Sequence, residues 1–402
     1  MPALVAADAG SFAARPADRG PRHCAGAPIR GTLPSLGAVD AALVVLSTAD
    51  CRLKGAAMRY AAITGWGMAV PDRVLTNADL ERMVETSDEW IVSRTGIKER
   101  RVVGPNDSTT SLSVDAARQA LDRAGLRPDE IDLIVVATCT PDQFLVSQAC
   151  LVQAELGGSA GAFDLGAACA GFVYALSTAS QFVQSGCYDR ALVIGVDTLT
   201  RFVDYTDRST CILFGDGAGA VVLEATDRPR GLLSTVLGAD GAGNKHLYIP
   251  GWGAFVPESA ELFPEYRPYL QMNGQEVFRF AVRVMGDAAA EAVDRAGLTF
   301  GDVNMLIPHQ ANVRIIDAAA RRLDLPREKV WVNVDRYGNT SAASIPIALF
   351  EAEAAGQLQE GNNLALVAFG GGLAWAAGVV RWGSEGVCRD PECRRRASLV
   401  AP

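Results

Sequence analysis

Residues 164–176 read DLGAACAGFVYAL, and this order of residue types predicts a strand, a tight turn and a helix. The apolar strand gives way to small residues at 166–168, and the residues from Gly171 onward form a buried helix. Cys169 lies on the turn, where free backbone N–H groups and the positive end of the helix dipole favour a thiolate over a thiol. Two interpretations follow: Cys169 is a nucleophile, or it is a small buried apolar residue, as many free cysteines are.

The size and charge of the chain exclude several classes of protein. Its 402 residues suffice for two domains or one duplicated unit, and a hydrophobic fraction of 49% is ordinary for a globular protein. A formal net charge of -9 argues against a nucleic-acid partner. Nine cysteines without a paired framework favour a reducing, cytoplasmic location, and no apolar run is long enough to span a membrane.

Residues 1–57 differ in composition from the rest of the chain. They are rich in Ala, Pro, Gly and Arg and lack apolar periodicity, which predicts a disordered extension, or one that precedes the true start at Met58. The remainder divides into an N-terminal half at 58–228, a C-terminal half at 229–383 and a tail at 384–402. We expect the tail to be a solvated extension.

The division into halves rests on an internal repeat. Residues 115–126 read DAARQALDRAGL and residues 287–298 read DAAAEAVDRAGL, an offset of 172 residues (287 minus 115). Each copy is followed by an acidic turn and an apolar strand, as in α/β proteins. At the same offset Gly166 corresponds to Gly338, which precedes Asn339. We therefore predict an internally duplicated α/β fold in which equivalent strand-to-helix turns meet at one site.

One histidine and one asparagine are candidates to act with the cysteine. His309 is one of three histidines and follows an apolar strand, at the end where α/β sheets carry their chemistry. Asn339 opens the turn YGNTSAAS. Taken singly, His309 could be a hydrogen-bonded core residue and Asn339 a helix N-cap. The duplication favours a catalytic group, because it brings the strand ends that carry Cys169, His309 and Asn339 together.

Six segments resemble β-ketoacyl-acyl-carrier-protein synthase III, a condensing enzyme of the thiolase superfamily. They occur in the family's order between about Met58 and Gly383, and read DEWIVSRTGIKER, AACAGFVYAL, FGDGAGAVVLE, PHQANVRII, YGNTSAAS and AFGGGLAW. The resemblance implies a thiolase-like fold with an internally duplicated, five-layered αβαβα architecture. It also implies that Cys169, His309 and Asn339 form the family's catalytic triad.

The resemblance further implies the reaction. An acyl-CoA, such as acetyl-CoA, would acylate Cys169, and malonyl-acyl carrier protein would lose carbon dioxide beside His309 and Asn339. The resulting enolate would attack the acyl group and give 3-oxoacyl-acyl carrier protein, the first condensation of fatty acid synthesis. We expect no metal and no cofactor, since the coenzyme A thioester is a substrate.

Further residues take roles only through this resemblance. The backbone N–H groups of Cys169 and Gly371 would form an oxyanion hole. Coenzyme A would be held by Thr86, Trp90, Arg94 and Arg208. The acyl pocket would be lined by Phe144, Phe172 and Phe369, with Phe144 entering the pocket of a partner subunit, which implies a homodimer. An acidic carrier protein would dock on Arg279, Arg314, Arg321 and Arg322.

Related activities remain open at this stage. Elongating condensing enzymes use two histidines, and thiolases use a second cysteine where this chain has glycines at 370–372. A starter-unit condensing enzyme of polyketide or other specialised metabolism would keep the triad and differ in its pocket. A non-catalytic subunit that binds carrier protein would have no need for all three triad residues.

Overall fold

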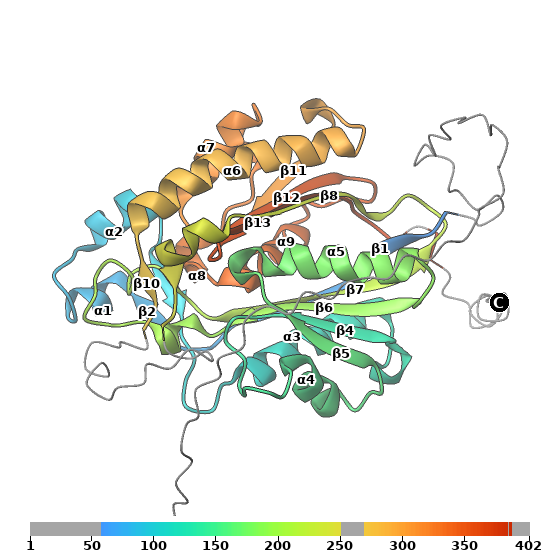
Figure 1. The fold of residues 1–402 in the computed structure, drawn as a ribbon, viewed down its shortest axis with the longest axis horizontal. Helices are drawn as coiled ribbons and strands as arrows, with labels where there is room; N and C mark the ends of the chain where they lie inside the picture. The colour runs from blue at the N-terminus through green and yellow to red at the C-terminus, as the bar shows by residue number, and fades with distance from the viewer. Residues whose placement is uncertain (1–57, 251–268, 385, 388–402) are drawn as a thin grey trace, which may run out of the picture. The chain divides into compact units, whose positions relative to one another are not determined.

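The computed structural model describes residues 58–250, 269–384 and 386–387 (Figure 1). The predictions for residues 1–57 and for most of the tail at 384–402 concern residues outside these ranges. All of the elements below belong to the described part of the chain.

The principal sheet consists of a set of five strands and a set of four, and the four have the same order as the first four of the five. The first set runs β1-β7-β6-β4-β5 and the second runs β8-β13-β12-β11. The first set comprises β1 (Tyr60–Ala69), β4 (Leu133–Ala137), β5 (Gly161–Leu165), β6 (Arg190–Asp197) and β7 (Gly217–Thr226). The second comprises β8 (Gly231–Ala239), β11 (Met305–Pro308), β12 (Asn363–Gly370) and β13 (Ala374–Arg381).

The direction of pairing repeats as well as the order. Strand β7 is antiparallel to β1 and β6, and β13 is likewise antiparallel to β8 and β12. Strand β4 is parallel to β6, as β11 is to β12. The two sets join where β1 meets β8 at the pair Ala61 and Gly231. The predicted internal duplication is therefore confirmed at the level of topology.

Helices complete the layers (Figure 1). Helices α3 (Thr109–Ala124) and α4 (Gln148–Leu156) cover the outer face of the first set of strands, and α6 (Gly274–Arg295) and α7 (Val313–Arg322) lie outside the second. Helices α5 (Gly171–Gln184) and α9 (Ser344–Ala354) lie between the two sets. The described elements thus form the five layers αβαβα that we predicted.

The repeated sequence DRAGL ends the two equivalent helices in the same way. Helix α3 ends before Gly125 and α6 ends shortly before Gly297, and these glycines have φ values of 66° and 69°. A residue with a side chain is strained in this left-handed conformation, so glycine is the usual residue after a helix.

Strand β4 lies between two layers of helices. Every residue of β4 is buried, as expected for a strand covered on both faces.

The remaining helices and strands are shorter. They are β2 (Val74–Thr76), α1 (Asn77–Glu81), α2 (Asp88–Thr95), β3 (Glu99–Arg101), β9 (Leu247–Tyr248), β10 (Gln271–Met272) and α8 (Val334–Tyr337). Thr76 caps α1, since its side chain accepts the N–H of Asp79.

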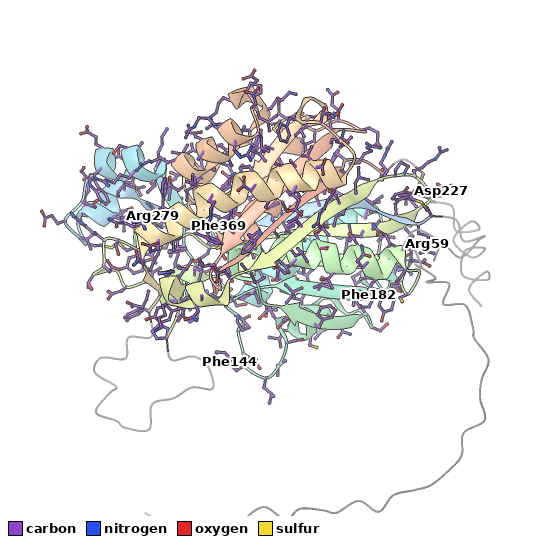
Figure 2. The ribbon with its side chains drawn as sticks, turned by 45° about the horizontal axis from the view of Figure 1, so that its top comes forward. Arg59, Phe144, Phe182, Asp227, Arg279 and Phe369 are labelled. Atoms are coloured by element: carbon purple, nitrogen blue, oxygen red, sulfur yellow. The ribbon has the colours of Figure 1, made fainter. Side chains whose placement is uncertain are left out.

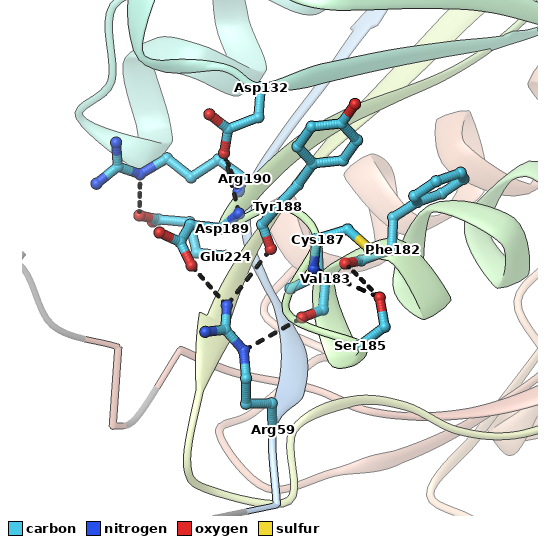
Figure 3. A network of polar contacts seen from close by, with 10 residues as sticks. All are labelled: Arg59, Asp132, Phe182, Val183, Ser185, Cys187, Tyr188, Asp189, Arg190 and Glu224. Atoms are coloured by element: carbon cyan, nitrogen blue, oxygen red, sulfur yellow. Dashed lines mark hydrogen bonds and ion pairs between the residues drawn. The ribbon is translucent and has the colours of Figure 1, made fainter. Parts of the chain in front are cut away.

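A polar network lies where β1 and β6 begin (Figure 3). The guanidinium of Arg59, just before β1, pairs with Asp189 at 2.5 Å and donates to the carbonyl of Val183 at 3.3 Å. The carboxylate of Asp132 accepts the N–H groups of Asp189 and Arg190 at 3.0 and 2.9 Å. Strand β6 runs from Arg190 in this network to Asp197 beside the site described next.

Candidate active site

Two turns of equivalent geometry meet at the centre of the molecule. Cys169 lies in a short 3-10 turn, Ala168–Ala170, between β5 and α5, and a second turn, Ser341–Ala343, precedes α9 in the same way. Ala168 and Ser341 open these turns with φ values of 46° and 51°, which are unusual for residues with side chains. The offset between them is 173 residues (341 minus 168), one more than between the repeated helices.

This extra residue corrects one correspondence drawn from the sequence. At the offset of the turns, Gly166 is equivalent to Asn339 and not to Gly338. The catalytic asparagine position therefore stands two residues before its turn, where the first half of the molecule has a glycine.

Cys169, His309 and Asn339 all line one small cavity of about 90 Å³. Cys169 is reached from β5, His309 directly follows β11, and Asn339 follows α8. The ring of Phe369, from β12, also lines this cavity and stands edge-on to His309 with 5.6 Å between ring centroids. The structure therefore brings the three predicted triad residues together.

His309 is a neutral imidazole in this environment. Burial lowers the pKa of His309 to about 3, because the charged ring would lose its hydration. Its Nδ1 lies 2.6 Å from the hydroxyl oxygen of Ser344. When that hydroxyl donates to Nδ1, the single ring proton is on Nε2, which leaves Nε2 as a hydrogen-bond donor.

The amide of Asn339 is oriented by the next turn. Its Oδ1 accepts the N–H of Ser341 at 2.9 Å, so its Nδ2 group is left to donate. The backbone is held on both sides, since Asn339 donates to the carbonyl of Leu213 at 2.8 Å and accepts from Gly215 at 3.0 Å. The site thus holds two neutral side-chain donors beside a thiol.

The sequence predicted a thiolate at Cys169, and the structure contradicts this prediction. Burial raises the pKa of the Cys169 thiol to about 12, and a hydrogen bond to Ser341 opposes this shift only in part. Cys169 is 6% exposed, so a thiolate there would lose most of its hydration. Loss of solvation therefore outweighs the helix start that favoured a thiolate in the sequence, and the resting group is a thiol.

A glycine turn closes on the backbone of Cys169. A Cβ atom at Gly370 would lie 2.6 Å from the Cys169 nitrogen, so this approach requires glycine. Cys169 and Gly371 both line a second, larger cavity of about 980 Å³. This proximity is compatible with an oxyanion hole made of their N–H groups, and that role remains a prediction.

The larger cavity has apolar walls that the sequence did not reveal. Its walls include Leu199, Phe202, Phe214, Ile249 and Leu270. Most of these residues come from loops and turns and follow no periodic pattern. Only Phe214, which begins the segment FGDGAGAVVLE, stood in a recognised motif.

The three phenylalanines predicted for the acyl pocket lie in different environments, and Figure 2 labels two of them, Phe144 and Phe369. Phe144 is 66% exposed on the loop after β4 and contributes to the rim of the larger cavity. Phe369 lines the smaller cavity instead. Phe172 lines neither of these two cavities, because it is fully buried in α5 and packs against Gly195 of β6.

The residues predicted to hold coenzyme A form a cluster at the surface. The guanidinium carbons of Arg94 and Arg208 lie 4.8 and 5.2 Å from the centroid of the Trp90 ring. Arg208 also donates to the carbonyl of Glu85 at 2.8 Å. The hydroxyl of the neighbouring Thr86 is buried and has no hydrogen-bond partner among the described residues. The cluster offers an aromatic face, two cations and a free hydroxyl.

The arginines predicted to dock a carrier protein are divided between two environments. Arg314 lies over the ring of Phe278 at 5.2 Å, next to α7 residues that line the smaller cavity. Arg279 pairs with Glu276 at 2.6 Å and lines a different, polar pocket with Asp240. The remaining two lie at the end of α7, where Arg321 is exposed and Arg322 pairs with Asp287 at 3.1 Å.

The fold and the site define a thiolase-fold condensing enzyme, that is, an acyltransferase that works through a cysteine. Residues 163–241 match the family model of 3-oxoacyl-[acyl-carrier-protein] synthase III, and residues 293–382 match the model of its C-terminal part. A β-ketoacyl-[acyl-carrier-protein] synthase III of Roseiflexus sp. (strain RS-1) is 55% identical over 324 residues, which are 80% of this chain and 98% of the relative. The chain belongs to the β-ketoacyl-acyl-carrier-protein synthase III family, whose members initiate fatty acid synthesis.

Solved structures agree with this assignment. The synthase III of Thermus thermophilus is 49% identical, with a TM-score of 0.76 over 80% of this chain and 99% of that one. The priming β-ketosynthase of the R1128 polyketide pathway is 39% identical, with a TM-score of 0.77 over 83% of this chain and 99% of that one. Within residues 58–250, 269–384 and 386–387, the helices are too short or too polar to cross a membrane.

Proposed function

We propose that this chain joins an acyl-CoA to malonyl-acyl carrier protein through an acyl-cysteine at Cys169. The products are 3-oxoacyl-acyl carrier protein, carbon dioxide and coenzyme A. The observation that carries the proposal is the small cavity lined by the thiol of Cys169 together with His309 and Asn339. The side chains provide a nucleophile and two neutral donors aimed at one space, as this reaction requires.

The first half-reaction transfers the acyl group. The sulfur of Cys169 attacks the thioester carbonyl, the carbon–sulfur bond to coenzyme A breaks, and the thiol proton leaves with coenzyme A. Backbone N–H groups of Cys169 and Gly371 stabilise the oxyanion of the tetrahedral intermediate. The acyl chain then occupies the larger cavity, whose apolar walls suit it.

The second half-reaction forms the carbon–carbon bond. The thioester oxygen of malonyl-acyl carrier protein accepts hydrogen bonds from Nε2 of His309 and Nδ2 of Asn339. Loss of carbon dioxide leaves an enolate at this oxygen, and the two donors stabilise the charge without themselves being charged. The enolate carbon attacks the acyl carbonyl and releases Cys169. A neutral His309, whose burial lowers its pKa to about 3, suits a donor better than a base.

The surface clusters support the proposed partners. Trp90, Arg94 and Arg208 combine a ring that can stack on adenine with cations for phosphate. Arg314 is exposed over Phe278, which lines the smaller cavity, and it is suited to an acidic carrier protein. We also propose a cytoplasmic location, which the free thiols among the described cysteines support.

We propose a homodimer on the basis of an exposed apolar loop. Phe144 and Leu145 are 66% and 105% exposed, and Phe144 stands at the rim of the larger cavity. Exposed apolar side chains of this size commonly mark an interface. The partner subunit would cover this loop and complete the end of the cavity.

A starter-unit condensing enzyme of specialised metabolism is the alternative. The likeness to the polyketide-priming structure supports it, although the relatives with higher identity are synthases III.

The test of the proposed condensation is a panel of acyl-CoAs, from acetyl to long and branched chains, assayed with malonyl-acyl carrier protein by the mass of the carrier product. Condensation of acetyl-CoA or another primer supports the proposal, and no product with any primer would contradict it.

A further inference from the structure

A buried arginine that the reaction above does not use holds the segment next to Asn339. Arg100 lies in β3 and is 0% exposed. Its Nη1 donates to the carbonyl of Leu75 at 3.2 Å and to Oδ1 of Asn77 at 2.9 Å, and its Nη2 donates to the carbonyl of Ile212 at 2.6 Å. These three acceptors are uncharged. Burial lowers the pKa of Arg100 to about 10, so the side chain is still a cation at neutral pH.

The bond to Ile212 leads directly to the asparagine of the active site. The next residue, Leu213, accepts the N–H of Asn339 at 2.8 Å, and Gly215 donates its own N–H to the carbonyl of Asn339 at 3.0 Å. The backbone of Asn339 is therefore held from both sides by residues 213–215. A displacement of Ile212 passes to Asn339 through one peptide unit and one hydrogen bond.

The stem of Arg100 approaches the same two stretches of backbone. A Cβ atom at Gly215 would lie 3.1 Å from the Cβ of Arg100, and one at Gly338 would lie 3.2 Å from it. Gly338 directly precedes Asn339, and Gly215 is its hydrogen-bond partner. Both distances are shorter than ordinary contacts, so β3 lies closely against the backbone on each side of the asparagine.

Asn77 fixes the other terminal nitrogen of the guanidinium. Its Oδ1 accepts from Arg100, and its Nδ2 donates to Oδ1 of Asp88 and to the carbonyl of Ile97, both at 2.8 Å. Asn77 begins α1, and Asp88 begins α2. The guanidinium thus joins residues 212–215 to a frame of other elements through buried hydrogen bonds, which hold a fixed geometry.

We propose that Arg100 is a positioning residue for the decarboxylation of malonyl-acyl carrier protein, because it fixes residues 212–215 and through them Asn339. Arg100 lines neither of the two described cavities at Cys169, so it acts without touching the substrate. Nδ2 of Asn339 stabilises the enolate only from the correct distance and direction. A small shift of its backbone should therefore slow this step.

The test is a double-mutant cycle on decarboxylation, measured as release of carbon dioxide from malonyl-acyl carrier protein. The variants are Arg100→Met, Asn339→Ala and the two changes combined. Arg100→Met keeps the length of the stem and removes the donors. Alone, it should lower kcat at least about tenfold and leave KM within about twofold. In Asn339→Ala, where no amide is left to position, the same change should cost less than about twofold.

Arg190→Met is the matched control. The Arg190 side chain is 18% exposed and pairs with Glu224 at 3.3 Å, but it lies where β6 begins, away from Asn339. The control should lose thermal stability and keep the wild-type rate of decarboxylation. Thermal unfolding is measured for every variant. If Arg100→Met does not fold, Arg100→Lys replaces it in the cycle, with the same pattern expected, because one ammonium cannot reproduce the two-pronged guanidinium.

Two results would overturn the role of Arg100 alone. One is a slow Asn339→Ala beside an Arg100→Met that decarboxylates at the wild-type rate. The other is an equal loss on changing Arg100 in both backgrounds, which indicates a general structural defect. The inference rests on the proposed function, in which Asn339 stabilises the enolate. Wild-type decarboxylation by Asn339→Ala would contradict that function and the inference with it.

Discussion

At the scale of single residues, each catalytic side chain has a neighbour that fixes its chemistry. The hydroxyl of Ser344 lies 2.6 Å from Nδ1 of His309, and when it donates there the ring proton is on Nε2. The N–H of Ser341 donates to Oδ1 of Asn339 and so orients its amide. The triad could be predicted from the sequence, because its members stand at strand ends of a repeat. The protonation of Cys169 could not, since desolvation depends on the layers that enclose the turn.

The roles of His309 and Asn339 can be separated from that of Cys169 by substitution. His309→Ala and Asn339→Asp should still accept an acyl group at Cys169, because neither change removes the nucleophile. Both should decarboxylate malonyl-acyl carrier protein on the order of a hundredfold more slowly, as expected for loss of one oxyanion donor. Asn339→Asp has the shape of the native residue with an acceptor in place of Nδ2. Wild-type decarboxylation by both variants would exclude donor roles.

The burial of His309 predicts a dependence of stability on pH. The folded pKa is about 3, below the ordinary value of 6.5, so the unfolded chain binds a proton that the folded chain excludes. The contribution of His309 to the free energy of unfolding is therefore fully present above pH 6.5, and it is lost as the pH decreases from 6.5 toward 3. Between pH 7 and pH 5 the free energy of unfolding should fall by about 2 kcal/mol more in the wild type than in His309→Gln. Urea unfolding of both proteins measures this difference, and equal pH dependence would contradict a buried neutral histidine.

At the scale of elements, two turns and two helix starts build the site. The repeat predicted their meeting, yet the turns are offset by 173 residues where the helices are offset by 172, so the alignment of Asn339 needed the structure. The cavity walls from loops, and the placement of Phe172 in the core, also required it, because contacts between distant segments leave no local pattern.

Helix α7 offers the clearest prediction about a partner. Arg314→Glu should raise the KM for malonyl-acyl carrier protein several-fold, with a defect that grows at low salt, because it reverses an exposed charge over Phe278, which lines the smaller cavity. Acylation by acyl-CoA should change little. Arg118→Glu, an equal charge reversal on α3, serves as the control. Equal KM values in the wild type and Arg314→Glu would show that Arg314 contacts solvent and does not bind the carrier protein.

At the scale of the whole molecule, the described core is formed by the duplicated layers of strands and helices. Arg59 stabilises the start of β1 through its contacts with Asp189 and Val183. A protein that begins at Met58 should therefore keep the thermal stability and turnover of the full chain. Arg59→Ala in that shorter protein should cost on the order of 1 kcal/mol, because it loses the pair with Asp189 and the bond to Val183. Thermal unfolding and steady-state assays measure both. A large loss on removing residues 1–57 alone would show that they contribute to the folded protein.

The central claim is that Cys169 accepts the acyl group, and one measurement tests it most directly. The protein is incubated with acetyl-CoA and digested, and the peptides are weighed by mass spectrometry. The account predicts one acetyl group on the peptide with Cys169 in the wild type and in Cys139→Ser, which changes the other thiol of the same cavity. It predicts none in Cys169→Ala, with condensation abolished while decarboxylation persists. An adduct on another residue, or condensation by Cys169→Ala, would contradict the account.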